Sequence, residues 1–130
     1  MTRPASGVRI KRAYEPPAED DGARVLVDRL WPRGVSKAAA ELTLWLKAVA
    51  PSAELRNWFG HDPARWTEFG RRYRAELQRN QEAVDRLRAL VKAGPVTLVD
   101  GARDTRHKDA GGWAAYLDEH LRYGEHGHPA

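Results

Sequence analysis

Arg24-Val25-Leu26-Val27-Asp28-Arg29-Leu30-Trp31-Pro32-Arg33-Gly34 is the stretch of sequence that decides the fold. Its apolar first half is typical of a buried strand, and we expect a strand over residues 24–30. Its charged and aromatic second half is costly to bury unless the polar groups find partners. A strand that runs directly into Asp-Arg and then Trp-Pro-Arg-Gly therefore indicates the edge of a functional site.

A second junction of the same kind follows Val96-Thr97-Leu98-Val99-Asp100, where the charged loop 101–108 begins. We expect a strand over 96–100 and another over 8–14, in which apolar and basic residues alternate. Ser36, Ser52 and Asp62 are placed as helix caps. Helical periodicity then predicts a short turn at 37–41 and longer helical segments at 53–59, 63–93 and 109–121. Whether 63–93 is one helix or two stays open, and Arg79-Asn80 is the expected break.

This order of elements predicts an α/β fold with a small, largely parallel sheet flanked by helices in three layers. Residues 8–122 are expected to form one α/β domain, with flexible termini at 1–7 and 123–130. The apolar cluster at 42–49 is assigned to no strand or helix. Because ligands of open α/β sheets bind beyond the carboxyl ends of the strands, both charged junctions are expected to border one site.

The composition is that of a globular chain with excess positive charge. The 130 residues carry a formal net charge of +4, and 42% are hydrophobic. Arginine greatly outnumbers lysine, which suits two-pronged contact with phosphate or carboxylate, although high-GC bacterial coding also favours arginine. The absence of cysteine excludes thiolate chemistry. No apolar run approaches the ~20 residues of a membrane span and no leader is visible, so we expect a cytoplasmic protein.

Several motifs along the chain carry a resemblance to a known family. They are Lys11-Arg12-Ala13-Tyr14, the run 25–34, Pro51-Ser52-Ala53-Glu54-Leu55-Arg56, Phe59, Phe69, Tyr73, Glu76, Leu77, Ala102-Arg103-Asp104 and His107. With them the chain resembles the YeaO-like family of uncharacterised bacterial proteins (domain of unknown function 488). The resemblance implies a compact α/β fold and a cytoplasmic location, and it implies no established activity. More distant relatives carry Cys-His-Arg where this chain has Lys108-Asp109-Ala110, so their cysteine chemistry does not carry over.

The first candidate site is an anion site built from the cations of the two junctions. Clustered guanidinium groups bind phosphate or carboxylate in two-pronged fashion. The expected ligand-binding residues are Arg29, Trp31, Arg33, Lys37 and Arg103, with Arg12 and Arg56 as possible further members. The alternative is that Arg29 and Arg103 only pair with neighbouring Asp residues and that Trp31 packs over the core. For Arg56 we favour pairing with Glu54 or Glu76.

The second candidate is acid–base catalysis by Asp28, Asp104 and His107. An unperturbed histidine titrates near pH 6.5, and a nearby carboxylate would orient it. The alternative is a network that braces the loops, in which His107 caps the last helix. The acids lack the spacing of a metal site, so we expect no resident metal. No phosphate-loop or dinucleotide motif is present, and we expect no cofactor.

Together these residues predict an Arg/Asp/His/Trp pocket at the carboxyl ends of the strands. It is expected to bind an anionic small molecule, phosphate-bearing or nucleotide-like, with acid–base catalysis as an open addition. The alternatives are a nucleic-acid-associated protein, which the mixed charges along the helices match poorly, and an interaction module without chemistry. No membrane partner is expected, and the oligomeric state does not follow from the sequence.

Overall fold

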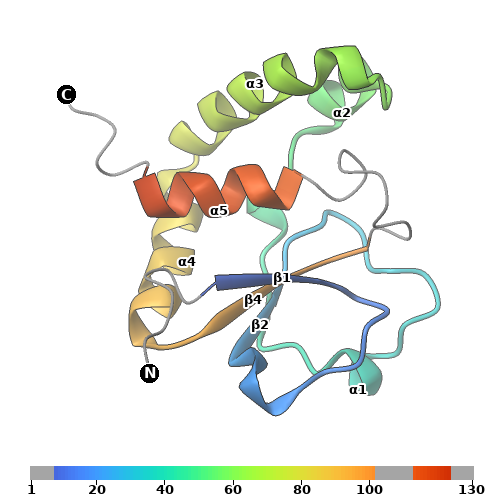
Figure 1. The fold of residues 1–130 in the computed structure, drawn as a ribbon, viewed down its shortest axis with the longest axis vertical. Coiled ribbons are helices and arrows are strands. Elements are labelled where there is room, and N and C mark those ends of the chain that lie inside the picture. Colours follow the sequence, from blue (N-terminus) through green and yellow to red (C-terminus); the bar gives the residue numbers. More distant parts are fainter. Residues whose placement is uncertain (1–7, 102–112, 124–130) are drawn as a thin grey trace.

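A computed structural model describes residues 8–101 and 113–123 (Figure 1). Within these residues the chain forms a four-stranded sheet in the order β1-β4-β2-β3, in which every neighbouring pair is parallel. The predicted α/β fold with a small parallel sheet is therefore confirmed. The strands are β1 (Val8–Arg12), β2 (Ala23–Leu26), β3 (Leu44–Trp45) and β4 (Val96–Asp100).

The helices begin where the sequence offers capping side chains. Ser36, Ser52 and Asp62 each accept a hydrogen bond from a backbone N–H in the first turn, as predicted. The long helical segment is divided at Arg79-Asn80, the predicted break. The helical elements are η1 (Glu19–Asp21), α1 (Lys37–Ala40), η2 (Lys47–Val49), α2 (Ala53–Phe59), η3 (Pro63–Arg65), α3 (Trp66–Gln78), α4 (Gln81–Ala93) and α5 (Trp113–Tyr123).

The two faces of the sheet are covered differently (Figure 1). The longer helices gather on one face, where Val25, Val27 and Leu98 of the sheet pack into the main core with side chains from α2 to α5. On the other face, Leu26 and Val99 pack against residues of the β2–α1 loop and of the segment before α2, around the short α1. The alternation of β2 between these two cores explains why its sequence is apolar at consecutive positions.

Strand ends differ from the sequence-based expectation. β2 ends at Leu26 rather than at residue 30: the Val27 N–H still pairs with the Val99 carbonyl, and beyond it Asp28 hydrogen-bonds through its side chain. β1 ends at Arg12 because Glu15 N–H donates to the Arg12 carbonyl and closes a turn. The apolar cluster at 42–49 contains the edge strand β3, which the sequence reading missed.

Two predictions fall wholly or partly outside the described residues. The flexible termini were predicted at 1–7 and 123–130, and of these only Tyr123 is described, as the last residue of α5. The last helix was predicted from residue 109, and its described part begins at Trp113. The helix therefore extends two residues past its predicted end at Leu121.

A buried ion pair fixes the start of β2. The Arg24 Nη1–Asp21 Oδ2 distance is 2.7 Å, and Lys11 Nζ lies 3.1 Å from Asp21 Oδ1. The Asp21 carbonyl accepts from Thr97 Oγ1 of β4 at 2.8 Å. Burial alone would raise the pKa of Asp21, but hydrogen bonds from Ala18 N–H and from the two cations outweigh it and lower the pKa. The network therefore ties the entry of β2 to both β1 and β4.

Candidate functional site

The two charged junctions meet at the carboxyl edge of the sheet. Asp28 follows β2, and Gly101 follows β4, the strand beside it. The Gly101 N–H donates to Asp28 Oδ2 at 2.7 Å, and Trp45 Nε1 donates to the Asp28 carbonyl at 2.7 Å. A Cβ added at Gly101 would lie 2.9 Å from Asp28 Oδ2, so glycine permits this close approach. Asp28 therefore connects the ends of β2, β3 and β4.

The Asp28 carboxyl is half-buried, and its pKa is shifted by its surroundings. Burial raises the pKa, while the Gly101 hydrogen bond and the positive charge of Arg56 oppose that rise; the net shift is upward. One carboxyl oxygen is thus engaged in holding the backbone of the neighbouring strand end. This matches the bracing alternative for Asp28, and it places the charge of Arg56 close enough to act on the carboxylate.

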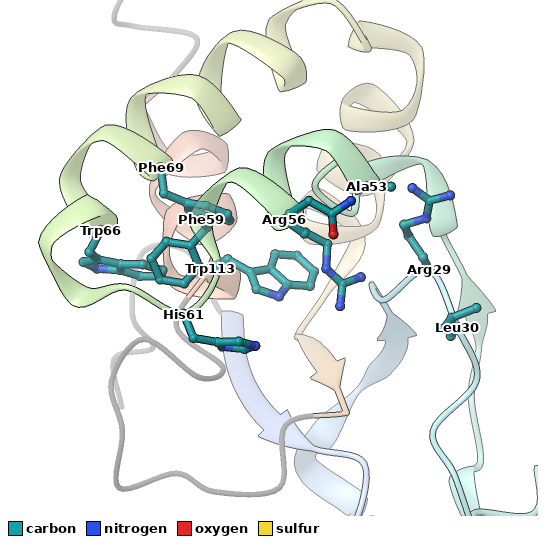
Figure 2. Close-up of a pocket in the computed structure, with 11 residues that line it drawn as sticks. Arg29, Leu30, Ala53, Arg56, Phe59, His61, Trp66, Phe69 and Trp113 are labelled. Carbon is teal, nitrogen blue, oxygen red and sulfur yellow. The ribbon is translucent and has the colours of Figure 1, made fainter.

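A pocket of about 540 Å³ opens beside this junction (Figure 2). It lies between the loop after β2, helix α2, the turn that leads into α3, and the first residue of α5. Its volume falls in the usual range of small-molecule sites, about 300–1,000 Å³. Its lining residues are Arg29, Leu30, Ala53, Arg56, Asn57, Phe59, Gly60, His61, Trp66, Phe69 and Trp113.

One part of the pocket is aromatic. The Phe59 ring centroid lies 5.5 Å from that of Trp66 and 4.9 Å from that of Phe69, and the Trp66 and Phe69 rings are stacked at 5.3 Å. Trp113 meets the buried Tyr73 edge to face at 5.7 Å. In Figure 2 the indole of Trp113 extends between this aromatic group and the arginines. The aromatic part is therefore continuous with the main core and rigidly packed.

The other part of the pocket is cationic. Arg29 comes from the loop after β2 and Arg56 from α2, and both are exposed at the pocket (Figure 2). Among the interactions of the described residues, neither guanidinium has an ion pair or a hydrogen bond. The favoured pairing of Arg56 with Glu54 or Glu76 is thus wrong. Glu76 instead accepts from Ser52 N–H at 2.9 Å and Ser52 Oγ at 2.5 Å.

The Ser52–Glu76 contact joins α2 to α3. Ser52 caps α2 by accepting from Leu55 N–H at 3.1 Å, and Glu76 of α3 holds Ser52 in place. The contact fixes α2 against α3 and engages both oxygens of the Glu76 carboxylate. Arg56 lies one turn further along α2, on the side that faces the pocket.

His61 lines the pocket from a strained backbone position. It follows Gly60, the C-cap of α2, and both residues lie in the left-handed region, with φ of 59° and 54°. A non-glycine residue is uncommon there, and such residues gather at functional sites. The His61 ring lies 6.1 Å from that of Phe59 and is exposed. Asn57, one turn before, adds an amide to the same lining.

Several residues predicted for the site lie elsewhere. Trp31 packs in the second core, with its ring 5.4 Å from Trp45 and its Nε1 donating to the Val35 carbonyl at 2.5 Å. Its position is that of the packing alternative, away from the pocket. The side chains of Arg33 and Lys37 are exposed, and neither lines the pocket. Of the ligand-binding residues predicted in the segment 29–37, only Arg29 lines the pocket.

The remaining predicted residues are Arg12 and three residues of the loop after β4. Arg103, Asp104 and His107 lie outside the described residues. Arg12 is described at the end of β1, where its Nε lies 3.7 Å from Glu15 Oε2. Sequence reasoning missed the pocket residues Asn57 and His61. The one sequence signal near them is Gly60, which marks the end of α2 and so the turn that brings His61 to the pocket.

Residues 7–129 match a family model described as "Inactive DUF488-N3 subclade". The chain belongs to the DUF488 family. The resemblance to its YeaO-like members is confirmed by curated relatives. The uncharacterised protein YeaO of Escherichia coli K12 is 39% identical over 103 residues, which cover 79% of this chain and 90% of YeaO.

Other relatives of this DUF488 domain come from mycobacteria. The uncharacterised protein Rv3073c of Mycobacterium tuberculosis H37Rv is 43% identical over 111 residues, covering 85% of this chain and 93% of Rv3073c. The uncharacterised protein Mb3100c of Mycobacterium bovis matches to the same extent. No solved structure gives a significant match. Among the described helices of this DUF488 chain, none has the length and apolarity needed to cross a membrane.

Proposed function

We propose that the pocket beside α2 binds a small anionic molecule through Arg29 and Arg56, and that it binds this molecule without transforming it. The observation that carries the proposal is the pair of unengaged guanidinium groups lining one concave site of about 540 Å³. Two cations that face a shared cavity repel each other, and an anion between them relieves that repulsion. Guanidinium groups also match the two-pronged geometry of phosphate and carboxylate.

Binding without catalysis is favoured for two reasons. The described acid of the predicted catalytic set, Asp28, is engaged by the Gly101 N–H and does not line the pocket. The description of the matching family model also contains the word "inactive". Acid–base chemistry by Asp104 and His107 remains the second reading of the family signature. We also propose a cytoplasmic location, from the composition alone.

A nucleic-acid surface is a weaker proposal because many basic residues on the helices are matched by acids. Arg71 and Arg72 both contact Glu68, at 2.8 and 2.9 Å. Such pairs neutralise the charge that a phosphate backbone would need. The same holds for the pairs Arg74–Glu119, Arg88–Asp85 and Arg122–Asp118.

The test is isothermal titration calorimetry with inorganic phosphate, citrate and AMP, on the wild-type chain and on Arg29→Gln and Arg56→Gln. Arg86→Gln is the matched control, since Arg86 is an exposed arginine of α4 outside the pocket. We expect at least one anion to bind, and each pocket variant to weaken it about 10- to 100-fold, the value of a charge-assisted contact. Wild-type affinity in both pocket variants, or no binding of any anion, would overturn the proposal.

A further inference from the structure

We infer that the ligand class of this pocket is a nucleoside monophosphate, with its phosphate at Arg29 and Arg56 and its base against the aromatic part. The inference rests on the proposed function and goes further, since it names which anion the site is shaped for. Its basis is the division of one pocket into a cationic part and an aromatic part, visible in Figure 2.

The division requires a ligand with two chemically different ends. Arg29 and Arg56 lie toward one end of the pocket in Figure 2, while Phe59 and Trp66 lie toward the other, with Trp113 between them. A bare inorganic anion would leave the half-buried rings of Trp66 and Trp113 in contact with water. A purely apolar ligand would leave both guanidinium groups without a partner. A planar ring joined to an anion by a short spacer contacts both parts.

The charge of the cationic part matches a single phosphate. Two guanidinium groups supply two positive charges, and a phosphate monoester carries about −1.5 to −2 at neutral pH. A carboxylate would neutralise only one of them. A triphosphate would exceed them, and the described residues of the lining include no lysine and no arginine besides these two. The charge balance therefore favours a monophosphate over a carboxylate or a triphosphate.

The aromatic part suits a base because of how its rings are held. Phe59 and Phe69 are buried and hold the half-buried Trp66 in place, so a ring placed against Trp66 costs little side-chain ordering. Stacking of a base on an aromatic side chain tolerates any base, because each base has a π-face. Asn57 offers a donor and an acceptor, and His61 offers a ring nitrogen; both can reach polar edges of a base or hydroxyls of a ribose.

The size of the pocket limits the ligand to one nucleotide. About 540 Å³ lies in the range of single small-molecule sites, and the described lining residues come from four stretches of chain, 29–30, 53–61, 66–69 and 113. A strand of nucleic acid would need a longer groove of unpaired cations. This argues for a free mononucleotide.

The experiment compares four probes by calorimetry on the full wild-type chain: AMP, adenosine, ribose 5-phosphate and inorganic phosphate. We expect AMP to bind at least 10-fold more tightly than each of the other three. UMP and GMP, tested next, are expected to bind within about 10-fold of AMP, since stacking does not select the base. Indole-3-acetate serves as an aromatic carboxylate and is expected to bind at least 10-fold more weakly than AMP.

Variants assign the two parts of the pocket. Arg56→Gln is expected to remove the preference of AMP over adenosine, and His61→Ala or Trp113→Leu to reduce the preference of AMP over ribose 5-phosphate. His61 is exposed, so its variant keeps the test available if Trp113→Leu does not fold. Arg86→Gln is again the control.

The outcomes separate the two proposals. If ribose 5-phosphate, inorganic phosphate or indole-3-acetate binds as tightly as AMP, this inference is overturned while anion binding stands. If adenosine binds as tightly as AMP and Arg56→Gln changes nothing, the pocket takes an aromatic ligand and the anion proposal fails. If no probe binds, both fail.

Discussion

Replacing Asp28 tests whether this residue braces two strand ends, as its geometry indicates. In Asp28→Ala the Gly101 N–H loses its acceptor, which in the wild type lies 2.7 Å away in a partly buried setting. An unsatisfied partly buried donor costs about 1–2 kcal/mol, so the melting temperature is expected to fall by about 4–8 °C. In Asp28→Asn the amide oxygen can still accept from Gly101, and we expect a change of less than about 1 kcal/mol.

The pH dependence of the Asp28→Asn variant gives the sign of the burial effect. Because the folded-state pKa of Asp28 is raised by burial, the stability that its protonated form contributes is complete below the unfolded pKa near 3.8 and is lost as pH rises through the folded pKa. The asparagine does not titrate. Relative to the wild type, Asp28→Asn should therefore gain stability between pH 4 and pH 7.

The assay for both variants is thermal unfolding followed by circular dichroism at pH 4, 5.5 and 7. A titration with inorganic phosphate at pH 7 accompanies it. Removal of the Asp28 charge takes away a negative charge that offsets Arg56, so anion binding should tighten modestly. Equal melting temperatures for Asp28→Ala and Asp28→Asn would refute the bracing contact. A loss of relative stability by Asp28→Asn as pH rises would refute the direction of the pKa shift.

Two further predictions concern the scaffold. Gly22→Ala should lower the free energy of unfolding by about 3 kcal/mol or more, because φ is +68° and a Cβ would lie 2.2 Å from the Pro95 carbonyl oxygen. Gly34→Ala should lower it by about 1 kcal/mol, because φ is +83° but a Cβ there would meet open space. Urea unfolding measures both changes. Burial, and after it the charge of Arg88, lower the pKa of His120 below 6.5. The stability that neutral His120 contributes is therefore complete above pH 6.5 and is lost as pH falls through the folded-state pKa. His120→Gln should make the free energy of unfolding depend less on pH between pH 7 and 5.

Each of these has a clear contrary result. Gly22→Ala unfolding at the same urea concentration as Gly34→Ala would show that the close approach to Pro95 contributes nothing. A stability curve for His120→Gln with the same slope as the wild type between pH 7 and 5 would assign that slope to other groups.

The fold followed from the sequence wherever the signal was local. The cap at Ser52, the break at Arg79-Asn80 and the buried strand at 96–100 depend on neighbouring residues, and the structure has all three. β3 was missed because two residues give no measurable alternation and its pairing with β2 is set by the register Val25–Leu44.

The candidate site was harder to predict because it depends on contacts between distant segments. The meeting of the two charged junctions follows from topology, since parallel strands bring Asp28 and Gly101 together. The position of Arg56 at the pocket depends on how α2 is held against α3, and the Ser52–Glu76 contact that holds it joins residues 24 apart in sequence, which no local pattern reveals. The sequence left open whether Trp31 contacts a ligand or packs over the core. In the structure it packs against Trp45 in the second core, a contact between segments that the sequence does not show.

The strand order has a consequence for how the chain folds during synthesis. β4 lies between β1 and β2, yet it is made last of the four strands. β1 and β2 therefore emerge with the edges that will face β4 unpaired. About 70 further residues are made after β2, and about 84 after β1, before β4 begins, which takes about 4–17 seconds at the ~5–20 residues per second of translation. Until Asp100 has left the ribosome the nascent chain lacks the centre of its sheet, and this interval is when it most needs protection from aggregation.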